Sequence, residues 1–287
     1  MISTVGFIGQ GWIGKNYADN FDARGFESVR YGLELEYIGN KDKIAECDIV
    51  CIAVPTPSTP DGFSLEHVRS ALTLVGKKKT VVVKSTLACG STEQLQKDFP
   101  ELYIFHVPEF LREAYARYDV DNPHRLFIGI PTKYVTNQTY VERAELIKDI
   151  MPEASYTRIL ASHEAEFLKY THNTIGYSTV LFTNMLYELG RSLDVEWDLV
   201  REAILNNPWF PEKYLSPDHQ GGRGAGGDCF IKDFAAFTEM YKERISGDPS
   251  GVALLNAMVR KNNQLLRSTE KSINLLNSVY GKDAGKE

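Results

Sequence analysis

The residues best suited to chemistry gather around one cysteine in the last quarter of the chain. Cys229 follows a run of glycines and stands just before Lys232 and Asp233 in the segment GGDCFIKD. Glycines permit positive φ and let a ligand approach closely, while a nearby ammonium favours the thiolate that attacks carbonyl carbons. The segment therefore predicts an activated nucleophile. The alternative is a buried structural cysteine behind a flexible loop, since most unpaired cysteines are inert core residues.

A second chemical signal lies at the start of the chain. The apolar run TVGFIG, residues 4–9, leads into a GxGxxG sequence and then into a helical stretch that reaches about Arg24. A strand, a glycine turn and a helix in this order are typical of a dinucleotide-binding unit, with the pyrophosphate at the helix N-terminus. The cofactor-binding residues predicted here are Gly9, Gly11, Trp12, Ile13 and Gly14.

The acidic residue that binds the adenosine ribose is less sharply defined. The second strand, predicted over about 28–33, should end in this residue. No acid stands at that position, but Glu34 and Glu36 follow close by, and either can serve. We expect Glu34 to bind the cofactor and the cofactor to be NAD. Arg30 leaves NADP open, because its side chain could hold a 2′-phosphate.

Further apolar runs predict the other strands of a parallel sheet. They are DIVCIAVPTP (48–57), TVVVKST (80–86), LYIFH (102–106), RLFIGI (125–130) and a run at about 154–159. Continuous apolar strands of this kind are buried on both faces, and open α/β sheets bind ligands at the carboxyl edge. A helix starting at Pro108 is expected to carry Glu109 and Glu113 one turn apart. Polar or turn residues at this edge are Pro55, Thr56, Lys84, Ser85, Thr86, Glu109 and Glu113.

The second half of the chain is predicted to be helical. Ser162 can cap a long helix over about 161–190, and shorter helices are expected at 194–206, 232–245 and 251–278. Apolar residues of the long helix recur three and four apart, which predicts one mostly buried seam. We interpret His172, on that seam, as a core residue and expect no metal site. The seam comprises Ala161, Ala165, Leu168, His172, Ile175, Thr179, Phe182, Leu186 and Leu189. The packing aromatics expected are Trp12, Trp197 and Trp209.

Length and composition narrow the class of protein. The 287 residues suggest two domains, and the net charge of −6 argues against nucleic acid or an anionic membrane as the main partner. The four cysteines show neither a disulfide framework nor CxxC spacing, which favours a reducing compartment. No run approaches a membrane span, and no signal peptide is recognised. We expect a cytoplasmic enzyme with a Rossmann-type doubly wound parallel sheet, followed by an all-α domain built on a long central helix.

In its ordered motifs the chain resembles the UDP-glucose/GDP-mannose 6-dehydrogenase family. The resemblance runs from Val5 to about residue 270 through GFIGQGWIG, AVPTP, KST, PEFLREA, NPHRLFIG, AEFLKYTHN and GGDCFIKD. Seven motifs in order are far more specific than any one of them. The resemblance implies an NAD-binding Rossmann domain over residues 1–160 and a helical central, dimerisation domain over 161–287 that carries the cysteine loop.

The activity implied by this resemblance is a four-electron oxidation of a sugar C6 alcohol to a carboxylate, with two hydrides passed to two NAD molecules in turn. Cys229 would capture the aldehyde as a thiohemiacetal, which the second oxidation converts to a thioester. Lys169 and Asn173 would hold the oxygen at the reacting carbon, where preorganised donors stabilise growing negative charge. Lys169 and Lys232 would favour the Cys229 thiolate.

The remaining roles are implied in the same way. Thr86 and Asp233 would position a water, and Glu109 would act as acid or base in thioester hydrolysis. The cofactor would contact Val54, Pro55, Thr56, Ser85, Thr86, Glu113 and Lys232. The sugar would contact Glu109, Phe110, Leu111, Arg112, Lys169, Asn173, Gly224 and Gly226.

Three features depart from the family pattern. The stretch 34–47 is short, Ile231 replaces an expected proline, and the sequence ends where the family's third domain begins. That domain normally holds much of the nucleotide. We therefore expect a short form without it, which acts on a smaller or differently carried sugar or has its site completed by a partner chain.

Two other functions and one assembly are also considered. The chain could be a two-electron dehydrogenase resembling the β-hydroxyacid enzymes, which also place a lysine and an asparagine on a long helix. It could instead be a non-catalytic relative that binds a sugar nucleotide or a protein. A homodimer through the helix at 161–190 is expected, because this helix has more apolar surface than a small helical domain can hide and the family pairs there. The sugar, its carrier and the choice between NAD and NADP are left open.

Overall fold

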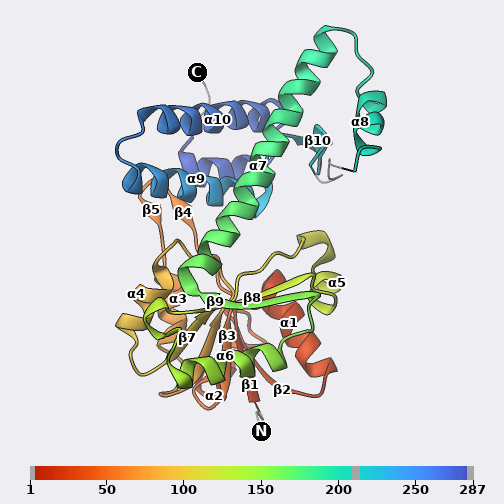
Figure 1. The fold of residues 1–287 in the computed structure, drawn as a ribbon. Coiled ribbons are helices and arrows are strands. Elements are labelled where there is room, and N and C mark those ends of the chain that lie inside the picture. The colour runs from red at the N-terminus through yellow and green to blue at the C-terminus, as the bar shows by residue number, and fades with distance from the viewer. Residues whose placement is uncertain (1–3, 209–213, 283–287) are drawn as a thin grey trace. The chain divides into compact units, whose positions relative to one another are not determined.

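The computed structural model describes residues 4–208 and 214–282, apart from the side chain of Asp228. The chain divides into two compact units. The first contains residues 1–56 and 64–169, and the second contains residues 57–63 and 170–287. Helix α7 (Ser162–Ser192) belongs to both, and the boundary lies after Lys169 within it. Figure 1 shows the elements with their labels. Trp209 lies outside the described residues.

Seven strands of the described chain form one sheet in the first unit, in the order β2-β1-β3-β6-β7-β8-β9. Neighbouring strands are parallel except β7 and β8, which are antiparallel. Because β2 and β3 lie on opposite sides of β1, the direction of winding reverses there, and the predicted doubly wound α/β fold is confirmed. The strands are β1 (Thr4–Ile8), β2 (Glu27–Tyr31), β3 (Ile49–Ile52), β6 (Thr80–Val83), β7 (Tyr103–His106), β8 (Arg125–Ile130) and β9 (Tyr156–Ala161).

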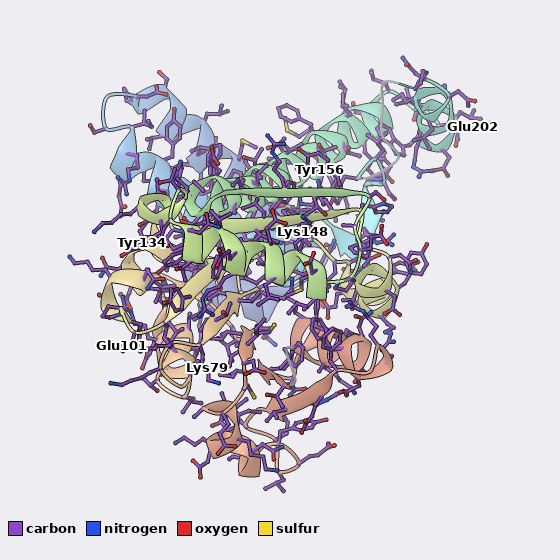
Figure 2. All side chains as sticks on the ribbon, turned by 60° about the horizontal axis from the view of Figure 1, so that its bottom comes forward. Lys79, Glu101, Tyr134, Lys148, Tyr156 and Glu202 are labelled. Atoms are coloured by element: carbon purple, nitrogen blue, oxygen red, sulfur yellow. The ribbon has the colours of Figure 1, made fainter. Side chains whose placement is uncertain are left out.

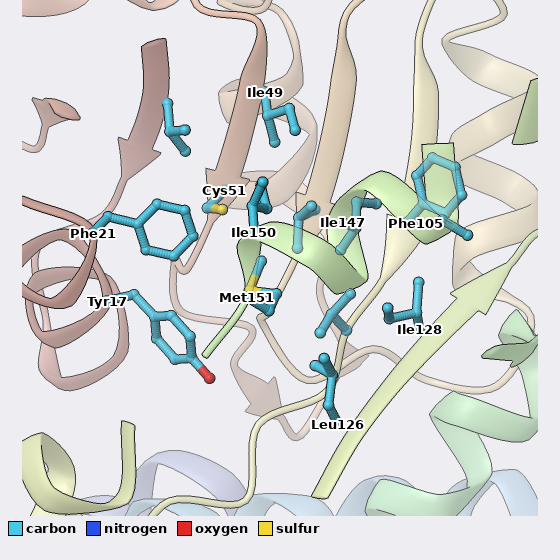
Figure 3. Close-up of a cluster of buried hydrophobic side chains, with 14 of the residues drawn as sticks. Tyr17, Phe21, Ile49, Cys51, Phe105, Leu126, Ile128, Ile147, Ile150 and Met151 are labelled. Atoms are coloured by element: carbon cyan, nitrogen blue, oxygen red, sulfur yellow. The ribbon is translucent and has the colours of Figure 1, made fainter. Parts of the chain in front are cut away.

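Each face of this sheet has its own hydrophobic core, because side chains along a strand alternate between faces. In β3, Ile49 and Cys51 pack on one face and Val50 and Ile52 on the other. Figure 3 shows the first core, where helices α1 and α6 cover the sheet. The helices of this unit are α1 (Trp12–Ala23), α2 (Lys41–Ile44), α3 (Glu66–Leu72), α4 (Ser91–Asp98), α5 (Ala116–Asp121) and α6 (Gln138–Ile150), with short 3-10 turns η1 (Ile38–Asn40), η2 (Glu113–Tyr115) and η3 (Thr132–Tyr134).

Helix α6 follows directly from its sequence. The Asn137 side chain caps it by accepting hydrogen bonds from the backbone N–H groups two and three residues later. Ala144, Ile147 and Ile150 recur three residues apart and are buried against the sheet. Lys148 lies between them in sequence and is exposed on the surface, where Figure 2 labels it.

The first turns of α7 are fastened to the first unit. Gly129 of β8 lets the helix approach closely, since an added Cβ would lie 2.9 Å from the Ser162 Cα and from the Ala165 Cβ. The buried Glu166 carboxylate accepts hydrogen bonds from the Gly90 N–H and from both the N–H and hydroxyl of Thr92 at the start of α4. Burial raises the pKa of Glu166 to about 7, against the opposing effect of these donors.

The second unit is mainly helical. Tyr177 and Phe234 stack at its centre, with ring centroids 3.8 Å apart and planes 8° apart. The helix predicted over 251–278 is two helices, because the chain takes positive φ at Glu270 and Ser272. The elements are β4 (Ser58–Thr59), β5 (Gly62–Phe63), α8 (Trp197–Leu205), β10 (Asp218–His219), β11 (Gly222–Arg223), α9 (Gly227–Arg244), α10 (Pro249–Ser268) and α11 (Ile273–Tyr280), together with most of α7.

Helix α7 buries a different face from the one predicted. Four residues of the predicted seam are more than half exposed: Ile175, Phe182, Leu186 and Leu189. A second set, which also recurs three and four apart, is buried instead: Tyr170, Asn173, Tyr177, Val180 and Asn184. The prediction was wrong because both faces carry the helical period, and periodicity alone does not say which one is covered.

Two local predictions were also wrong. Residues 107–112 form no helix, because the Glu109 carboxylate accepts the N–H groups of Phe110 and Leu111 and so competes with helical hydrogen bonding. Only the short turn η2 begins at Glu113. Trp12, expected to pack in the core, is 58% exposed at the start of α1.

Substituting Gly14 tests the glycine turn. An added Cβ would lie 1.8 Å from the Gly9 carbonyl oxygen, a backbone atom that cannot rotate away. We expect Gly14→Ala to lower the free energy of unfolding by about 1–3 kcal/mol, measured by urea denaturation. Gly39→Ala is the control, since an added Cβ there meets nothing within 4 Å. Equal midpoints for the two variants would contradict the close approach.

Candidate functional site

The glycine turn after β1 has the geometry of a phosphate cradle. Gly9 has a φ of +91°, and an added Cβ would lie 2.3 Å from the Ala53 carbonyl oxygen, so the ends of β1 and β3 nearly touch. Gly11 is the N-cap of α1, and an added Cβ there meets nothing within 4 Å. The first N–H groups of a helix lack intrahelical partners and favour an anion. The turn therefore fits the pyrophosphate of a dinucleotide.

The two residues considered for the adenosine ribose of the cofactor differ in whether their side chains are already ion-paired. Arg30 forms ion pairs with Asp19 and Asp22 of α1, with N···O distances of 2.6 and 2.5 Å. Its guanidinium is therefore already committed to two carboxylates. Glu34 is exposed beyond β2, and its Oε2 atom lies 2.1 Å from where a Gly32 Cβ would stand, close to Gln10. The Glu34 carboxylate thus lies beside the glycine turn.

The loops that follow β3 and β6 are joined by one hydroxyl. Ser85 Oγ donates to the Val54 carbonyl at 2.7 Å and accepts from the Val54 N–H at 3.0 Å. Thr56 is buried, Pro55 is exposed and Thr86 is half-buried. The structure thus brings Val54 and Ser85 together at the carboxyl edge of the sheet, next to the glycine turn.

Four hydrogen-bond donors contact the Glu109 carboxylate. Its Oε2 accepts from the Tyr17 hydroxyl at 2.7 Å and lies 3.1 Å from the Lys84 ammonium. Its Oε1 accepts from the N–H groups of Phe110 and Leu111 at 2.8 and 3.1 Å. The Lys84 ammonium also lies 4.0 Å from the centroid of the Tyr17 ring. Both oxygens are therefore held by two donors each.

These contacts determine which groups are charged. Burial alone raises the pKa of Glu109, but Lys84, Tyr17 and the Phe110 N–H outweigh it and leave the pKa below its usual value. Burial, with the Glu109 charge beside it, raises the pKa of Tyr17 well above normal. The buried His106 has its pKa lowered to about 3 by burial, with Lys84 and Lys169 adding to the effect. His106 is thus neutral, with Nδ1 donating to the Val83 carbonyl.

Lys169 is placed by the loop that carries Glu109. Its Nζ donates to the Glu109 backbone carbonyl at 2.7 Å and lies 5.4 Å from the Phe110 ring centroid. Arg112, in contrast, is engaged by Asp119, with an N···O distance of 2.6 Å. Glu113 and Arg112 are both exposed. Of the predicted residues on this loop, Glu109 and Phe110 are the ones that the structure brings to Lys169.

In the second unit, three predicted residues form one connected group. The Asn173 side-chain N–H donates to Asp233 Oδ2 at 2.5 Å, and the Lys232 ammonium contacts Asp233 Oδ1 at 2.6 Å. His172 Nδ1 lies 2.9 Å from Asn173 Oδ1. The Lys232 carbonyl accepts from the Ser58 hydroxyl at 3.0 Å. The buried Asp233 carboxylate therefore links the side chains of Asn173 and Lys232.

Cys229 lies in the first turn of α9, not in the loop where the sequence placed it. The helix begins at Gly227, with Gly226 as N-cap, and the Cys229 side chain is exposed. The segment GGD thus ends a loop and starts a helix, and the expected start at 232 was wrong. Because the Cys229 side chain is exposed, the alternative of a buried structural cysteine is excluded. Two other cysteines are buried, and burial raises the pKa of Cys47 to about 11 and that of Cys51 to about 12.

The glycine-rich loop before Cys229 is fixed by side chains of α10 and the turn after it. Asn262 brackets the backbone of Ala225, accepting from its N–H at 2.7 Å and donating to its carbonyl at 3.0 Å. Lys271 donates to two further loop carbonyls at 3.1 and 3.0 Å. Added Cβ atoms at Gly224 and Gly226 would lie 3.0 Å from Asn262 Oδ1 and 2.8 Å from Lys271 Cε. Close packing therefore accounts for these two glycines.

Two family models match the chain. One, for the NAD binding domain of the UDP-glucose/GDP-mannose dehydrogenase family, matches residues 26–146. The other, for the central domain of the same family, matches residues 163–264. Together they cover more than half of the sequence. The chain belongs to the UDP-glucose/GDP-mannose dehydrogenase family.

Individual relatives agree with this assignment. A UDP-glucose 6-dehydrogenase of Bacillus subtilis, YwqF, is 28% identical over 253 residues, which are 83% of this chain and 54% of that protein. A UDP-glucose dehydrogenase of Pyrobaculum islandicum superposes with a TM-score of 0.77 at 25% identity, over 96% of this chain and 71% of its own. A 3-hydroxyisobutyrate dehydrogenase of Mycobacterium tuberculosis shares the fold, with a TM-score of 0.68 at 14% identity over 94% of each chain. The chain spans about half the length of the curated relatives it matches.

Sequence reasoning missed several residues of these clusters. Tyr17 carries no motif and lies 92 residues from Glu109, so only the fold reveals the contact. Lys84 was placed at the sheet edge without a role, and its position after a buried strand was the available signal. Asn262 was placed on the inner side of the helix predicted over 251–278 without a role, and Lys271 gave no signal. Within residues 4–208 and 214–282, no set of three His, Cys, Asp or Glu side chains could hold a metal ion. In the same residues, no helix has the length and apolarity to cross a bilayer.

Removing the Asn262 side chain should destabilise the glycine-rich loop before Cys229, because its two hydrogen bonds to the Ala225 backbone are lost. We expect Asn262→Ala to lower the free energy of unfolding, by roughly 1–3 kcal/mol for each of the two Ala225 groups left unsatisfied. Urea denaturation measures this loss, and hydrogen exchange of the Ala225 amide should accelerate. Asn256→Ala, on the same helix and only half-buried, is the matched control and should change little. An unchanged Ala225 exchange rate would show that other contacts fix the loop.

Proposed function

We propose that this chain catalyses an NAD-dependent, four-electron oxidation of the C6 primary alcohol of a sugar or nucleotide sugar to a uronate. The observation that carries the proposal is an exposed cysteine in the first turn of α9, preceded by a fixed loop and followed by the Lys232–Asp233 pair. Membership of the family and the glycine turn support it further. Cys229, rather than another cysteine, suits the role because it is exposed.

The cofactor is assigned to the first unit. NAD, when bound, accepts the hydride in each of the two oxidations. Gly9, Gly11 and the N-terminus of α1 would hold its pyrophosphate, and Glu34 its ribose. We favour NAD over NADP because the Arg30 guanidinium is engaged by Asp19 and Asp22 and so is not available to a 2′-phosphate.

The chemistry of the sugar carbon is assigned to the protein's own groups. The Cys229 thiolate attacks the aldehyde carbon, forming a C–S bond, while Lys169 and Asn173 donate hydrogen bonds to the oxygen. After the second oxidation the carbon is a thioester. A water positioned by Thr86 and Asp233 attacks it and gives its proton to the Glu109 carboxylate; the C–S bond breaks, the thiolate is restored and the uronate leaves.

A two-electron dehydrogenase is the second candidate. The observation behind this candidate is the fold that the chain shares with a 3-hydroxyisobutyrate dehydrogenase over 94% of each chain. In this case Lys169 and Asn173 would act on the substrate oxygen and Cys229 would have no covalent role. A non-catalytic relative is the third candidate, and turnover by the purified chain would exclude it.

Cofactor stoichiometry and one substitution separate these candidates. For the four-electron reaction we expect two NADH per sugar oxidised, and Cys229→Ala should abolish uronate formation because no thioester can form. Absorbance at 340 nm and product analysis measure the two quantities over a panel of sugars and nucleotide sugars. Cys47→Ala is the control, since that thiol is buried. One NADH per substrate, unaffected by Cys229→Ala, would establish the two-electron reaction instead.

We also propose a homodimer through α7. Ile175, Phe182, Leu186 and Leu189 follow one another at intervals of seven, four and three residues, which places them on one face of the helix. They are 62, 57, 55 and 57% exposed, so they form an exposed apolar stripe. A contiguous exposed apolar surface of this kind is typical of a protein interface. A second copy of the same helix would bury the stripe symmetrically.

Sedimentation tests the dimer directly. We expect the mass of two chains at micromolar concentration and the mass of one chain for the double variant Phe182→Asp, Leu186→Asp, because two buried charges oppose pairing. Leu35→Asp is the control: Leu35 is 95% exposed and belongs to the first unit, not to α7. A single-chain mass for the unmodified protein would disprove the assembly.

A further inference from the structure

Lys84 and Tyr17 have no role in the reaction derived above, yet both contact its Glu109 carboxylate. Lys84 is only 2% exposed, in the loop after β6, and its ammonium lies 3.1 Å from Glu109 Oε2. Tyr17, on α1, donates its hydroxyl to the same oxygen at 2.7 Å. Two donors, one from α1 and one from the loop after β6, thus contact the same carboxylate oxygen.

This arrangement selects one protonation state of Glu109. An ionised carboxylate has about four acceptor positions, and here four donors fill them: one hydroxyl, one ammonium and two backbone N–H groups. A proton on Oε1 would face two backbone N–H groups, which cannot accept a hydrogen bond. A proton on Oε2 would lie beside the Lys84 ammonium and could be accepted only if the Tyr17 hydroxyl turned its own proton away. The buried ammonium in turn is tolerated only beside a negative charge. The geometry therefore requires a carboxylate and an ammonium together.

We propose that Lys84 and Tyr17 are positioning residues that hold the Glu109 carboxylate ionised and oriented, so that it serves as a base and not as an acid. The inference rests on the proposed function, in which Glu109 receives the proton of the attacking water. On that step, one donor must yield its place to the water. The Tyr17 hydroxyl is a neutral side-chain donor, so it can do so without removing the Lys84 charge that keeps Glu109 ionised.

The other ionisable groups around this pair do not supply the charge. Lys169, from α7, contacts the Glu109 backbone carbonyl and not the carboxylate. His106, at the end of β7, is neutral because its pKa is lowered to about 3 by burial. Cys51, on β3, stays a thiol because burial raises its pKa to about 12. Among the described residues, Lys84 is the cation whose ammonium contacts the carboxylate.

The first test follows hydrolysis of the thioester as a function of pH. Removing the ammonium raises the pKa of Glu109, so Lys84→Met should move the acid limb of the pH profile upward by about 1–3 pH units. Tyr17→Phe should move it upward by less, and Lys84→Arg, which retains the charge, should restore it. A merely structural role lowers the rate at every pH and leaves the limb in place. An unmoved limb in Lys84→Met therefore overturns the proposal.

The second test needs no turnover. Carbon-13 NMR of the labelled carboxyl group, identified by its loss in Glu109→Gln, gives the pKa of Glu109 in the unmodified protein and in Tyr17→Phe. We expect a value below that of an ordinary glutamate and an upward shift in the variant. Tyr17→Phe removes only a hydroxyl, so it serves where Lys84→Met does not fold. An unperturbed Glu109 pKa would overturn the inference.

Comparing the two tests separates this inference from the proposed function. A shifted Glu109 titration in a chain that forms no uronate would overturn the proposed function and support the electrostatic pairing. Cys229-dependent uronate formation with an unshifted titration would support the function and overturn the inference. Movement of both the pH limb and the NMR titration supports both.

Discussion

Burial of an ammonium without a counter-charge is among the most costly arrangements in a protein interior, and the first unit is organised around avoiding it. Lys84 follows a strand that is buried on both faces, so its side chain cannot reach solvent. Glu109 supplies the counter-charge only because residues 107–112 leave the helical path and turn the carboxylate inward. The same turn aims the Glu109 carbonyl at Lys169. One electrostatic requirement thus connects α1, the ends of β6 and β7, and α7.

The second unit meets a different requirement with similar means. A loop that is rich in glycine would be disordered by its entropy if nothing held it. Here Asn262 and Lys271 satisfy its backbone polar groups from outside, and the glycines leave room for those side chains. The cost of ordering the loop is met before any ligand binds, which is what preorganisation of a site means. Cys229 then emerges at a defined place, in the first turn of a helix.

The sequence predicted those parts of the fold that depend on local pattern. Apolar runs with turn residues at their ends identified the strands to within a few residues, and the glycine spacing located the tight turn between β1 and α1. The buried side of α7 could not be predicted, because Ile175 and Tyr177 belong to two stripes of the same period. The Tyr17–Glu109 contact could not be predicted either, since nothing local links residues 92 positions apart. The helix expected at Pro108 does not form, because the Glu109 side chain accepts hydrogen bonds from the backbone N–H groups of Phe110 and Leu111.

Continuity of α7 sets a length within the candidate site. Lys169 falls in the first compact unit and Asn173 in the second, yet a single unbroken helix carries both. With a rise of 1.5 Å per residue, the two positions are about 6 Å apart along the helix axis. This spacing follows from the geometry of the helix and does not depend on how either end of α7 is packed. The backbone distance between the two polar residues is therefore fixed by the helix and not by a loop.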